Sequence, residues 1–260
     1  MRVTWLDNNS WLWEMAHHRI LVDPWLVGPL VFGNAPWLFR GERSRPCPPP
    51  DRIDLILLSQ GLEDHAHVAT LRGLDKAIPV VASPNGARVA TDLGFQQVTA
   101  LAHHHTHTHG EIIVTALPGA PIGPTLKENG YVVMTSDRAT RLFYEPHGYH
   151  PISLRDHGPV DVVITPMVDL TLPLVGPIIR GRASAQELAD WLQPQVMLPT
   201  ANAGETAYRG LLASLLKAQG SVAEVRQQLA AQGHSTTVLE PAVGVAMDLP
   251  LATKPTPSVS

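Results

Sequence analysis

Residues 53–67 read IDLILLSQGLEDHAH, and this stretch decides the fold. Its first part is an apolar run of strand length that ends at Ser59. A turn glycine, two carboxylates and two histidines follow directly. A buried strand delivers polar groups to the edge of a core in this way, and such edges often carry the chemistry of a protein. We therefore expect a functional site just past Ser59.

The same stretch resembles the second motif of the metallo-β-lactamase superfamily. In that motif a buried strand ends in Ser-His-x-His-x-Asp-His, and its side chains hold one or two metal ions. Asp64 and His65 match the closing Asp-His, whereas Gln60 and Leu62 stand where the family has its first two histidines. The resemblance therefore implies a metal site that lacks half of this motif.

Other segments resemble further motifs of the family. Asp23 ends a strand and precedes a proline, as does the family's first-motif aspartate, which supports the site by hydrogen bonding. A later strand leads into Glu145-Pro-His147, and His147 falls where the family has the aspartate that bridges two metals. No histidine is found at the places of the third and fifth motifs, near Gly119 and Thr200.

Over nearly the whole chain, the resemblance implies an α/β fold, the four-layer αββα sandwich of the metallo-β-lactamase type. It also implies a degenerate subgroup of the lactonase-like branch that reads Ser-Gln-Gly-Leu-x-Asp-His. Because 260 residues with 44% hydrophobic side chains are enough to bury one large core, we expect a single domain over residues 1–252. The Pro- and Ser-rich residues 253–260 are expected to form a flexible tail.

Charge and composition exclude several classes of protein. The net charge is −4 and no basic face is evident, so we expect no nucleic-acid partner. Cys47 is the only cysteine, which excludes an internal disulfide and suits a reducing compartment. We find no signal-peptide pattern and no apolar segment of membrane-spanning length, so a cytoplasmic protein without a transmembrane segment is expected.

The number of ligands limits the metal site. A catalytic zinc site has about three protein ligands and a water. The resemblance leaves Asp64, His65 and His147 as metal ligands, with Glu145 and His67 as further polar groups. We therefore expect at most one ion, of the zinc class, and allow for none. Asp64, His65 and Glu145 are the candidate catalytic residues.

Three classes of function stay open. The first is a metal-dependent hydrolase of a small ester, lactone or phosphate. The second is a catalytically inactive fold that binds a ligand or serves as a scaffold. The third is a metal-handling protein that uses the histidine row His103–His109. Alternate residues of such a row would share one face of an extended strand, although a solvated hairpin is the favoured interpretation of the row.

The segment Trp25–Phe39 is aromatic but interrupted by glycine and proline, which predicts an ordered loop. It would either pack over the sandwich or form a hydrophobic lid or docking surface, including one for a homo-oligomer. On the second reading, replacing Trp37 and Phe39 should weaken binding or self-association with little effect on folding.

Local patterns predict the remaining elements. We expect a hairpin of residues 3–13 and 19–22, and a helix over 66–74. A helix over 83–93 should be capped by Ser83, and a helix ending near Gln193 should begin with a capping box at Ser184. Helices over 205–219 and 222–232 should follow, with a second capping box at Ser221, and residues 238–249 should close the sheet.

Overall fold

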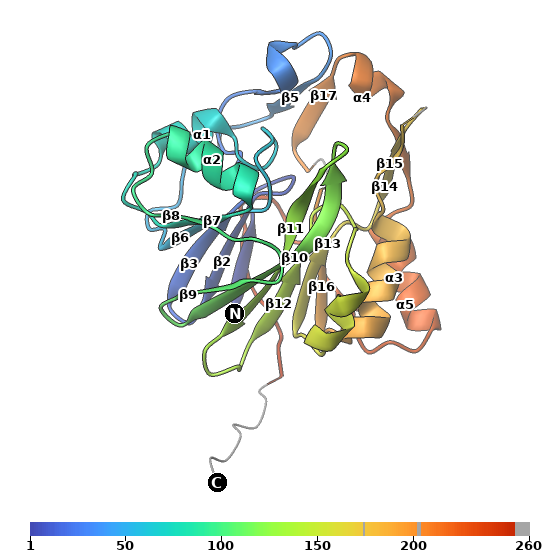
Figure 1. Ribbon diagram of the computed structural model, residues 1–260. Coiled ribbons are helices and arrows are strands. Elements are labelled where there is room, and N and C mark those ends of the chain that lie inside the picture. Colours follow the sequence, from blue (N-terminus) through green and yellow to red (C-terminus); the bar gives the residue numbers. More distant parts are fainter. Residues whose placement is uncertain (174, 202–203, 253–260) are drawn as a thin grey trace.

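The computed structural model describes residues 1–173, 175–201 and 204–252. The tail expected over residues 253–260 lies outside the described residues. Within the described part, two large sheets pack face to face and each carries helices on its outer side (Figure 1). This arrangement confirms the αββα sandwich.

The first sheet has the strand order β20-β1-β2-β3-β6-β7-β8 among the described residues. Its strands are β20 (Ala246–Asp248), β1 (Arg2–Trp5), β2 (Trp11–Met15), β3 (His18–Val22), β6 (Leu55–Leu58), β7 (Val80–Ala82) and β8 (Val98–Ala100). β3, β6, β7 and β8 run parallel, with α1 (Val68–Gly73) between β6 and β7 and α2 (Pro84–Asp92) between β7 and β8. Because both faces of β6 are covered, all four of its residues are buried and apolar.

The second sheet has the order β19-β16-β13-β12-β11-β10-β9 in the same part of the chain. Its strands are β19 (Thr237–Val238), β16 (Val196–Pro199), β13 (Val162–Thr165), β12 (Arg141–Tyr144), β11 (Leu126–Thr135), β10 (Ile112–Ile122) and β9 (Thr106–His109). Its outer face is covered by η2 (Ile152–His157), α3 (Gly181–Leu192) and α5 (Val222–Ala231). The ends of β6 and β12 therefore approach each other from the two facing sheets.

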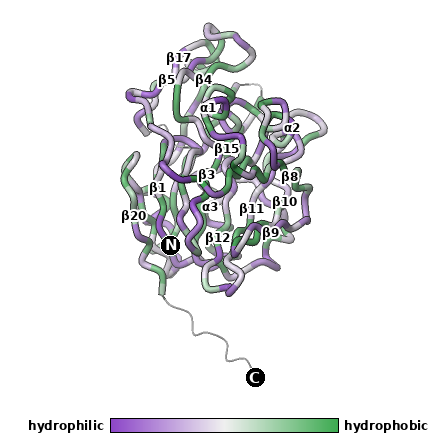
Figure 2. The backbone as a smooth tube through the Cα atoms, turned by 90° about the vertical axis from the view of Figure 1, so that its left-hand side faces the viewer, coloured by the Kyte–Doolittle hydropathy of each residue, from purple (hydrophilic) through white to green (hydrophobic). Residues whose placement is uncertain are grey.

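A smaller lobe lies at one end of the sandwich, away from the N-terminus (Figures 1 and 2). It contains β4 (Leu30–Val31), η1 (Phe32–Asn34), β5 (Arg40–Arg43), β17 (Thr206–Arg209) and α4 (Leu211–Leu215). A further small sheet joins β14 (Asp169–Leu172), β15 (Gly176–Ile179) and β18 (Lys217–Gln219). The helix predicted over residues 205–219 is therefore wrong, because β17 pairs with β5 and β18 pairs with β14.

Three other local predictions need correction. α3 begins at Gly181 and includes Ser184, so the predicted capping box lies inside the helix. The N-terminal hairpin is a three-stranded meander, because residues 3–13 contain two strands, β1 and β2. Residues 238–249 contribute to both large sheets, through β19 and β20. The caps at Ser83 and Ser221 are confirmed, since each side chain accepts a hydrogen bond from the third residue of its helix.

The aromatic segment Trp25–Phe39 divides between core and surface. Trp25 is fully buried and Phe39 is 9% exposed, and together with Leu30 they form a small apolar cluster in the lobe. Phe39 packs against Phe32 and Tyr208, with ring centroids 5.2 and 5.4 Å apart. The burial of Phe39 favours the alternative that this part of the loop packs onto the fold, and the effect of replacing it on folding stays a prediction. Trp37, in the same segment, is 69% exposed.

Replacing Phe39 or Trp37 separately should lower the free energy of unfolding by very different amounts. We expect Phe39→Ala to lower the free energy of unfolding by about 3 kcal/mol, the low end for a buried aromatic side chain. Trp37→Ala should change it by less than about 0.5 kcal/mol, because the indole is largely in water. Urea denaturation of the two variants measures the difference. Equal losses would mean that the indole also packs against the fold.

No helix in the described residues is both long and apolar enough to cross a lipid bilayer.

Candidate metal centre

The turn after β6 brings Asp64 and His65 to one edge of the sandwich. A single helical turn places them, because the amides of His65 and Ala66 both donate to the carbonyl oxygen of Leu62. The His65 side chain is fully buried, and its Nε2 lies 3.2 Å from Asp64 Oδ2. This local turn therefore directs two adjacent side chains into the same space.

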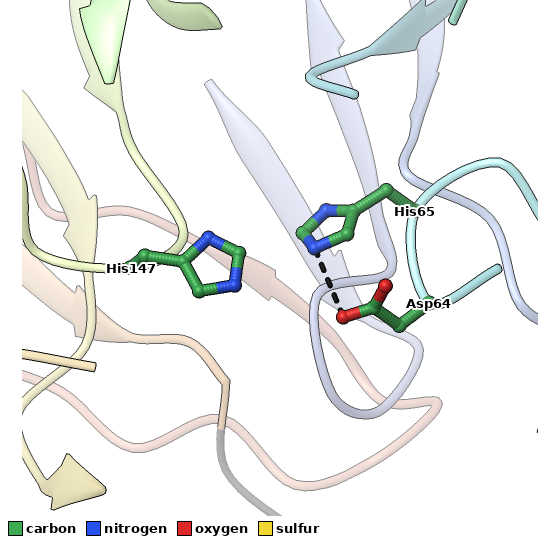
Figure 3. A group of neighbouring side chains, drawn as sticks. All are labelled: Asp64, His65 and His147. Carbon is green, nitrogen blue, oxygen red and sulfur yellow. Dashed lines mark ion pairs between the residues drawn. The ribbon is translucent and has the colours of Figure 1, made fainter. Parts of the chain in front are cut away.

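His147 reaches the same space from the second sheet, after β12. Its ring centroid lies 5.1 Å from that of His65. One donor atom from each of Asp64, His65 and His147 lies within 4.8 Å of the others. Figure 3 shows His147 facing the other two side chains across the gap between the sheets. The structure thus brings together the three residues that the sequence marked as metal ligands.

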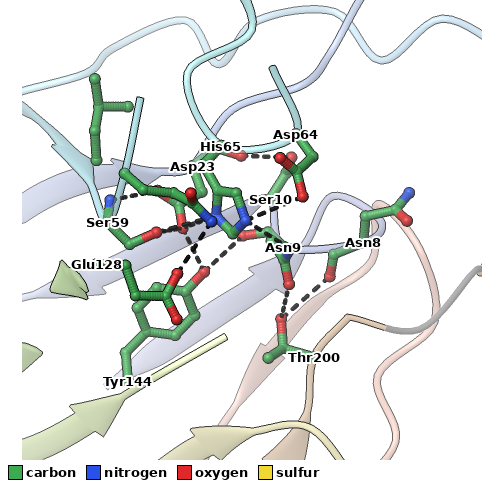
Figure 4. A network of polar contacts seen from close by, with 12 residues as sticks. Asn8, Asn9, Ser10, Asp23, Ser59, Asp64, His65, Glu128, Tyr144 and Thr200 are labelled. Atoms are coloured by element: carbon green, nitrogen blue, oxygen red, sulfur yellow. Dashed lines mark hydrogen bonds and ion pairs between the residues drawn. The ribbon is translucent and has the colours of Figure 1, made fainter. Parts of the chain in front are cut away.

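Asp23 sets the orientation of His65 (Figure 4). Its Oδ2 lies 2.9 Å from His65 Nδ1 and also accepts hydrogen bonds from the hydroxyls of Ser59 and Tyr144. An Nδ1–H donated to a carboxylate leaves the lone pair of Nε2 for a metal ion. Asp23 therefore has the supporting position that the sequence resemblance implied.

The charges around His65 are consistent with a cation site. Burial acts to lower the pKa of this imidazole, but Asp64 and Asp23 outweigh burial and raise it well above the usual value. Burial also acts to raise the pKa of Asp64, and the neighbouring His65 and His147 lower it instead. Positive charge is thus favoured next to Asp64, and a metal ion at His65 would take the place of the imidazolium proton.

The donor atoms also fit an ion chemically. Asp64 Oδ1 is buried, and it has no hydrogen-bond partner among the described residues. A buried carboxylate oxygen without a partner is costly unless a cation or a donor satisfies it. Two imidazoles and one carboxylate form a mixed nitrogen and oxygen set, which suits zinc better than magnesium or calcium. An ion of the zinc class would therefore fit these three side chains.

Glu145, expected to be catalytic, organises the loop that carries His147. Its Oε2 accepts hydrogen bonds from the backbone amides of His147, Gly148 and Tyr149. Its Oε1 is buried and has no partner within the described chain. Burial, together with the charge of Glu128, raises the pKa of Glu145 well above its usual value. The structure therefore gives Glu145 a clear role in shaping the loop, and its catalytic role stays a prediction.

Glu128 is a site residue that sequence reasoning missed. It lies in β11 with no exposed surface, and burial raises the pKa of its carboxyl to about 7. His147 Nδ1 lies 2.8 and 2.9 Å from its two oxygens. Glu128, Glu145 and His147 also form a second group of close metal donors. The sequence around it, Lys127-Glu128-Asn129-Gly130, carries no local signal of this role.

The turn between β1 and β2 supplies further polar groups. Asn9 Nδ2 lies 3.4 Å from His65 Nε2, and Asn9 Oδ1 accepts a hydrogen bond from Thr200. Tyr144 donates to Asp23, as described, and its hydroxyl also lies 3.2 Å from the Asn9 carbonyl oxygen. The run Asp7-Asn8-Asn9-Ser10 was the sequence signal, since polar residues at a strand end are typical of a site.

His67 and the histidine row lie outside both groups of metal donors found in the described residues. His67 caps α1, with its Nδ1 accepting from the Thr70 amide. His104 has a φ of +66°, which breaks the extended row. Only His107 and His109 therefore share a face of β9. This geometry gives no support to a chelating row.

Comparisons with known proteins agree with this architecture. No curated protein sequence matches the chain significantly. An isothiocyanate hydrolase from Delia radicum gut bacteria is 17% identical and has a TM-score of 0.67, with 96% of this chain and 99% of that chain covered. Igni18, a metallo hydrolase from Ignicoccus hospitalis, is 14% identical with a TM-score of 0.66, and the match covers 95% of this chain and 98% of that one.

A third solved structure, the metallo-β-lactamase fold protein YhfI from Bacillus subtilis, is 14% identical with a TM-score of 0.62. That match covers 95% of this chain and 99% of the other. At these identities the likeness concerns the fold alone. The sequence itself matches the family model of the beta-lactamase superfamily domain over residues 2–201. The chain therefore belongs to this superfamily and has the metallo-β-lactamase fold.

Proposed function

We propose that the protein is a metal-dependent hydrolase of a small ester, lactone or phosphate, with one zinc-class ion at Asp64, His65 and His147. The observation that carries the proposal is the convergence of these three donors from both sheets, one of which, Asp64, has a buried oxygen without a partner among the described residues. When bound there, such an ion would polarise a carbonyl or phosphoryl oxygen or lower the pKa of a water.

The chain's own residues prepare this space. Asp23 engages Nδ1 of His65, so Nε2 is the nitrogen that points toward Asp64 and that an ion would use. Asn9 Nδ2 lies 3.4 Å from that nitrogen, so its amide faces the position of a bound substrate or water. Glu145 holds the loop that presents His147. These contacts preorganise a site on rigid strand ends, which is what hydrolysis of a small substrate requires.

A catalytically inactive binding fold is the second candidate. The observation that favours it is the ion pair between Asp64 and His65, which satisfies the imidazole without an ion. Gln60 and Leu62, at the places of two family histidines, point the same way. On this reading the site around His65 and His147 would bind a ligand without chemistry.

Calorimetric titration with zinc distinguishes the metal-dependent hydrolase from the inactive binding fold. The protein should be purified without an affinity tag and stripped of metal beforehand. We expect one ion per chain, and a loss of affinity of at least about 100-fold in both His65→Ala and His147→Ala, beyond the effect of losing an outer partner. The double variant His105→Ala/His107→Ala is the control and should bind as the wild type does. Binding heat that stays unchanged in His65→Ala and His147→Ala would favour the inactive fold. Heat lost only in the control would favour metal handling by the row.

A further inference from the structure

We propose that Gln60 and Glu128 are positioning residues that hold the His147 imidazole with its Nε2 toward Asp64 and His65. The value of this orientation for an ion rests on the proposed function. The hydrogen-bond chain from Gln60 through Glu128 to His147 does not depend on it, and it can be tested in the metal-free protein.

Glu128 fixes the His147 ring directly. Both carboxylate oxygens lie within 2.9 Å of Nδ1, and Glu128 is fully buried. An Nδ1–H donated to this carboxylate defines one tautomer, and the acceptor lone pair is then on Nε2. Figure 3 shows the far edge of the His147 ring on the side of Asp64. Glu128 thus does for His147 what Asp23 does for His65.

The backbone of β10 contacts the Glu128 side chain closely at Gly119 and Ala120. Its pairing with β11 shifts in register between Pro118 and Pro121, and the amide of Ala120 donates to Glu128 Oε1 at 3.1 Å. A Cβ atom on Gly119 would lie 2.8 Å from Glu128 Cγ, so only glycine allows this approach. Bulges often redirect groups beside a functional site. The strand irregularity therefore serves to hold this carboxylate in place.

Gln60 holds the other oxygen. Its Nε2 donates to Glu128 Oε2 at 3.1 Å, and the residue is only 2% exposed. Leu62 is 44% exposed, although the resemblance places both residues on missing histidines. The two side chains therefore have different positions relative to the site. Leu62 has left the site, whereas Gln60 stays in it and anchors the carboxylate that orients His147.

Histidine-labelled protein tests the proposal. In two-bond ¹H–¹⁵N spectra of the metal-free wild type, we expect His147 as the Nδ1–H tautomer. Glu128→Leu removes the acceptor, so the Nε2–H form should appear, and zinc affinity should fall about 10- to 100-fold, as for other outer partners of metal ligands. Glu128→Gln keeps an oxygen that accepts from Nδ1 and should restore the tautomer. Gln60→Leu should shift the His147 signals and weaken zinc binding by a smaller factor.

Glu187→Leu is the matched control, because Glu187 pairs with another buried histidine, His150, at 3.1 Å. It should leave the His147 signals and zinc affinity unchanged. An unchanged Nδ1–H signal in Glu128→Leu would overturn the positioning role even if zinc binds. If Glu128→Leu does not fold, unchanged His147 signals in Gln60→Leu would overturn it. A wild type that takes up no zinc would refute the proposed function alone, because the tautomer comparison still decides the role of Glu128.

Discussion

Asp23→Ala is expected to lower the free energy of unfolding by about 3 to 5 kcal/mol, the usual cost of removing one partner from a buried polar network. Asp23 is fully buried and accepts from the backbone amide and the hydroxyl of Ser59, at 2.7 and 2.6 Å. It also accepts from the Tyr144 hydroxyl at 2.6 Å and pairs with His65 at 2.9 Å. Alanine would remove the acceptor of the Ser59 amide, which is buried, and would leave Tyr144, Ser59 and His65 with only their weaker or secondary contacts.

Urea denaturation of Asp23→Ala and Asp248→Ala measures this cost. Asp248 also carries a carboxylate–cation pair, with Arg2 at 2.7 Å, but both side chains are exposed. Its loss should therefore cost at most about 1 kcal/mol. A similarly small change for Asp23→Ala would show that water replaces the carboxylate in this network.

Gly148→Ala is expected to cost about 2 to 6 kcal/mol and to weaken zinc binding, because strained backbone and overpacking each contribute about 1 to 3 kcal/mol. Gly148 has a φ of +78°, and a Cβ there would lie 2.2 Å from the carbonyl oxygen of Arg180. The residue directly follows His147, and its amide donates to Glu145. Relief of the clash must therefore displace the loop that carries His147.

Gly123→Ala is the natural control for this variant. Gly123 has a similar φ of +71°, but nothing lies within 4 Å of its added Cβ. It should lose only the backbone preference, about 1 kcal/mol, and keep the affinity of the wild type for zinc. Equal effects in the two variants, measured by urea denaturation and by zinc titration, would mean that the contact with Arg180 relaxes without moving His147.

The sequence predicted those parts of the site that depend on short-range patterns. The apolar run before Ser59 marks β6 because a strand covered on both faces needs no polar alternation. Asp64 and His65 lie in the turn after that run, and His147 follows the strand that ends at Tyr144, but all three were assigned as metal ligands through the family resemblance. Asp23, at the end of β3, was assigned its hydrogen-bonding role through the family resemblance.

Glu128 could not be found in this way. Its partners Gln60, Ala120 and His147 come from three other segments, and only the pairing of β10 with β11 and the docking of the two sheets bring them to it. A lone glutamate in a strand ordinarily points to solvent. Nothing local distinguishes Glu128 from such a residue.

The prediction of a helix over residues 205–219 was wrong for a related reason. The run Leu211-Leu-Ala-Ser-Leu-Leu216 has strong helix propensity, and α4 does form within it. β17 and β18 on either side pair with strands that are distant in sequence, and Gly210 and Gly220 have positive φ values where these short elements end. Long-range strand pairing here overrides local preference.

The seam between the sheets also determines when the centre can form during folding. Asp64 and His65 follow a strand of one sheet, and His147 follows a strand of the other. Neither sheet carries the full set of ligands, so affinity for an ion can arise only after the two sheets have docked. An ion would then bind only the state in which the two sheets are docked. The free energy of binding would therefore add to the stability of the contact between the sheets. An ion bound there would link the two sheets directly, so its removal should lower the stability of their docking, which the shared apolar core then maintains alone.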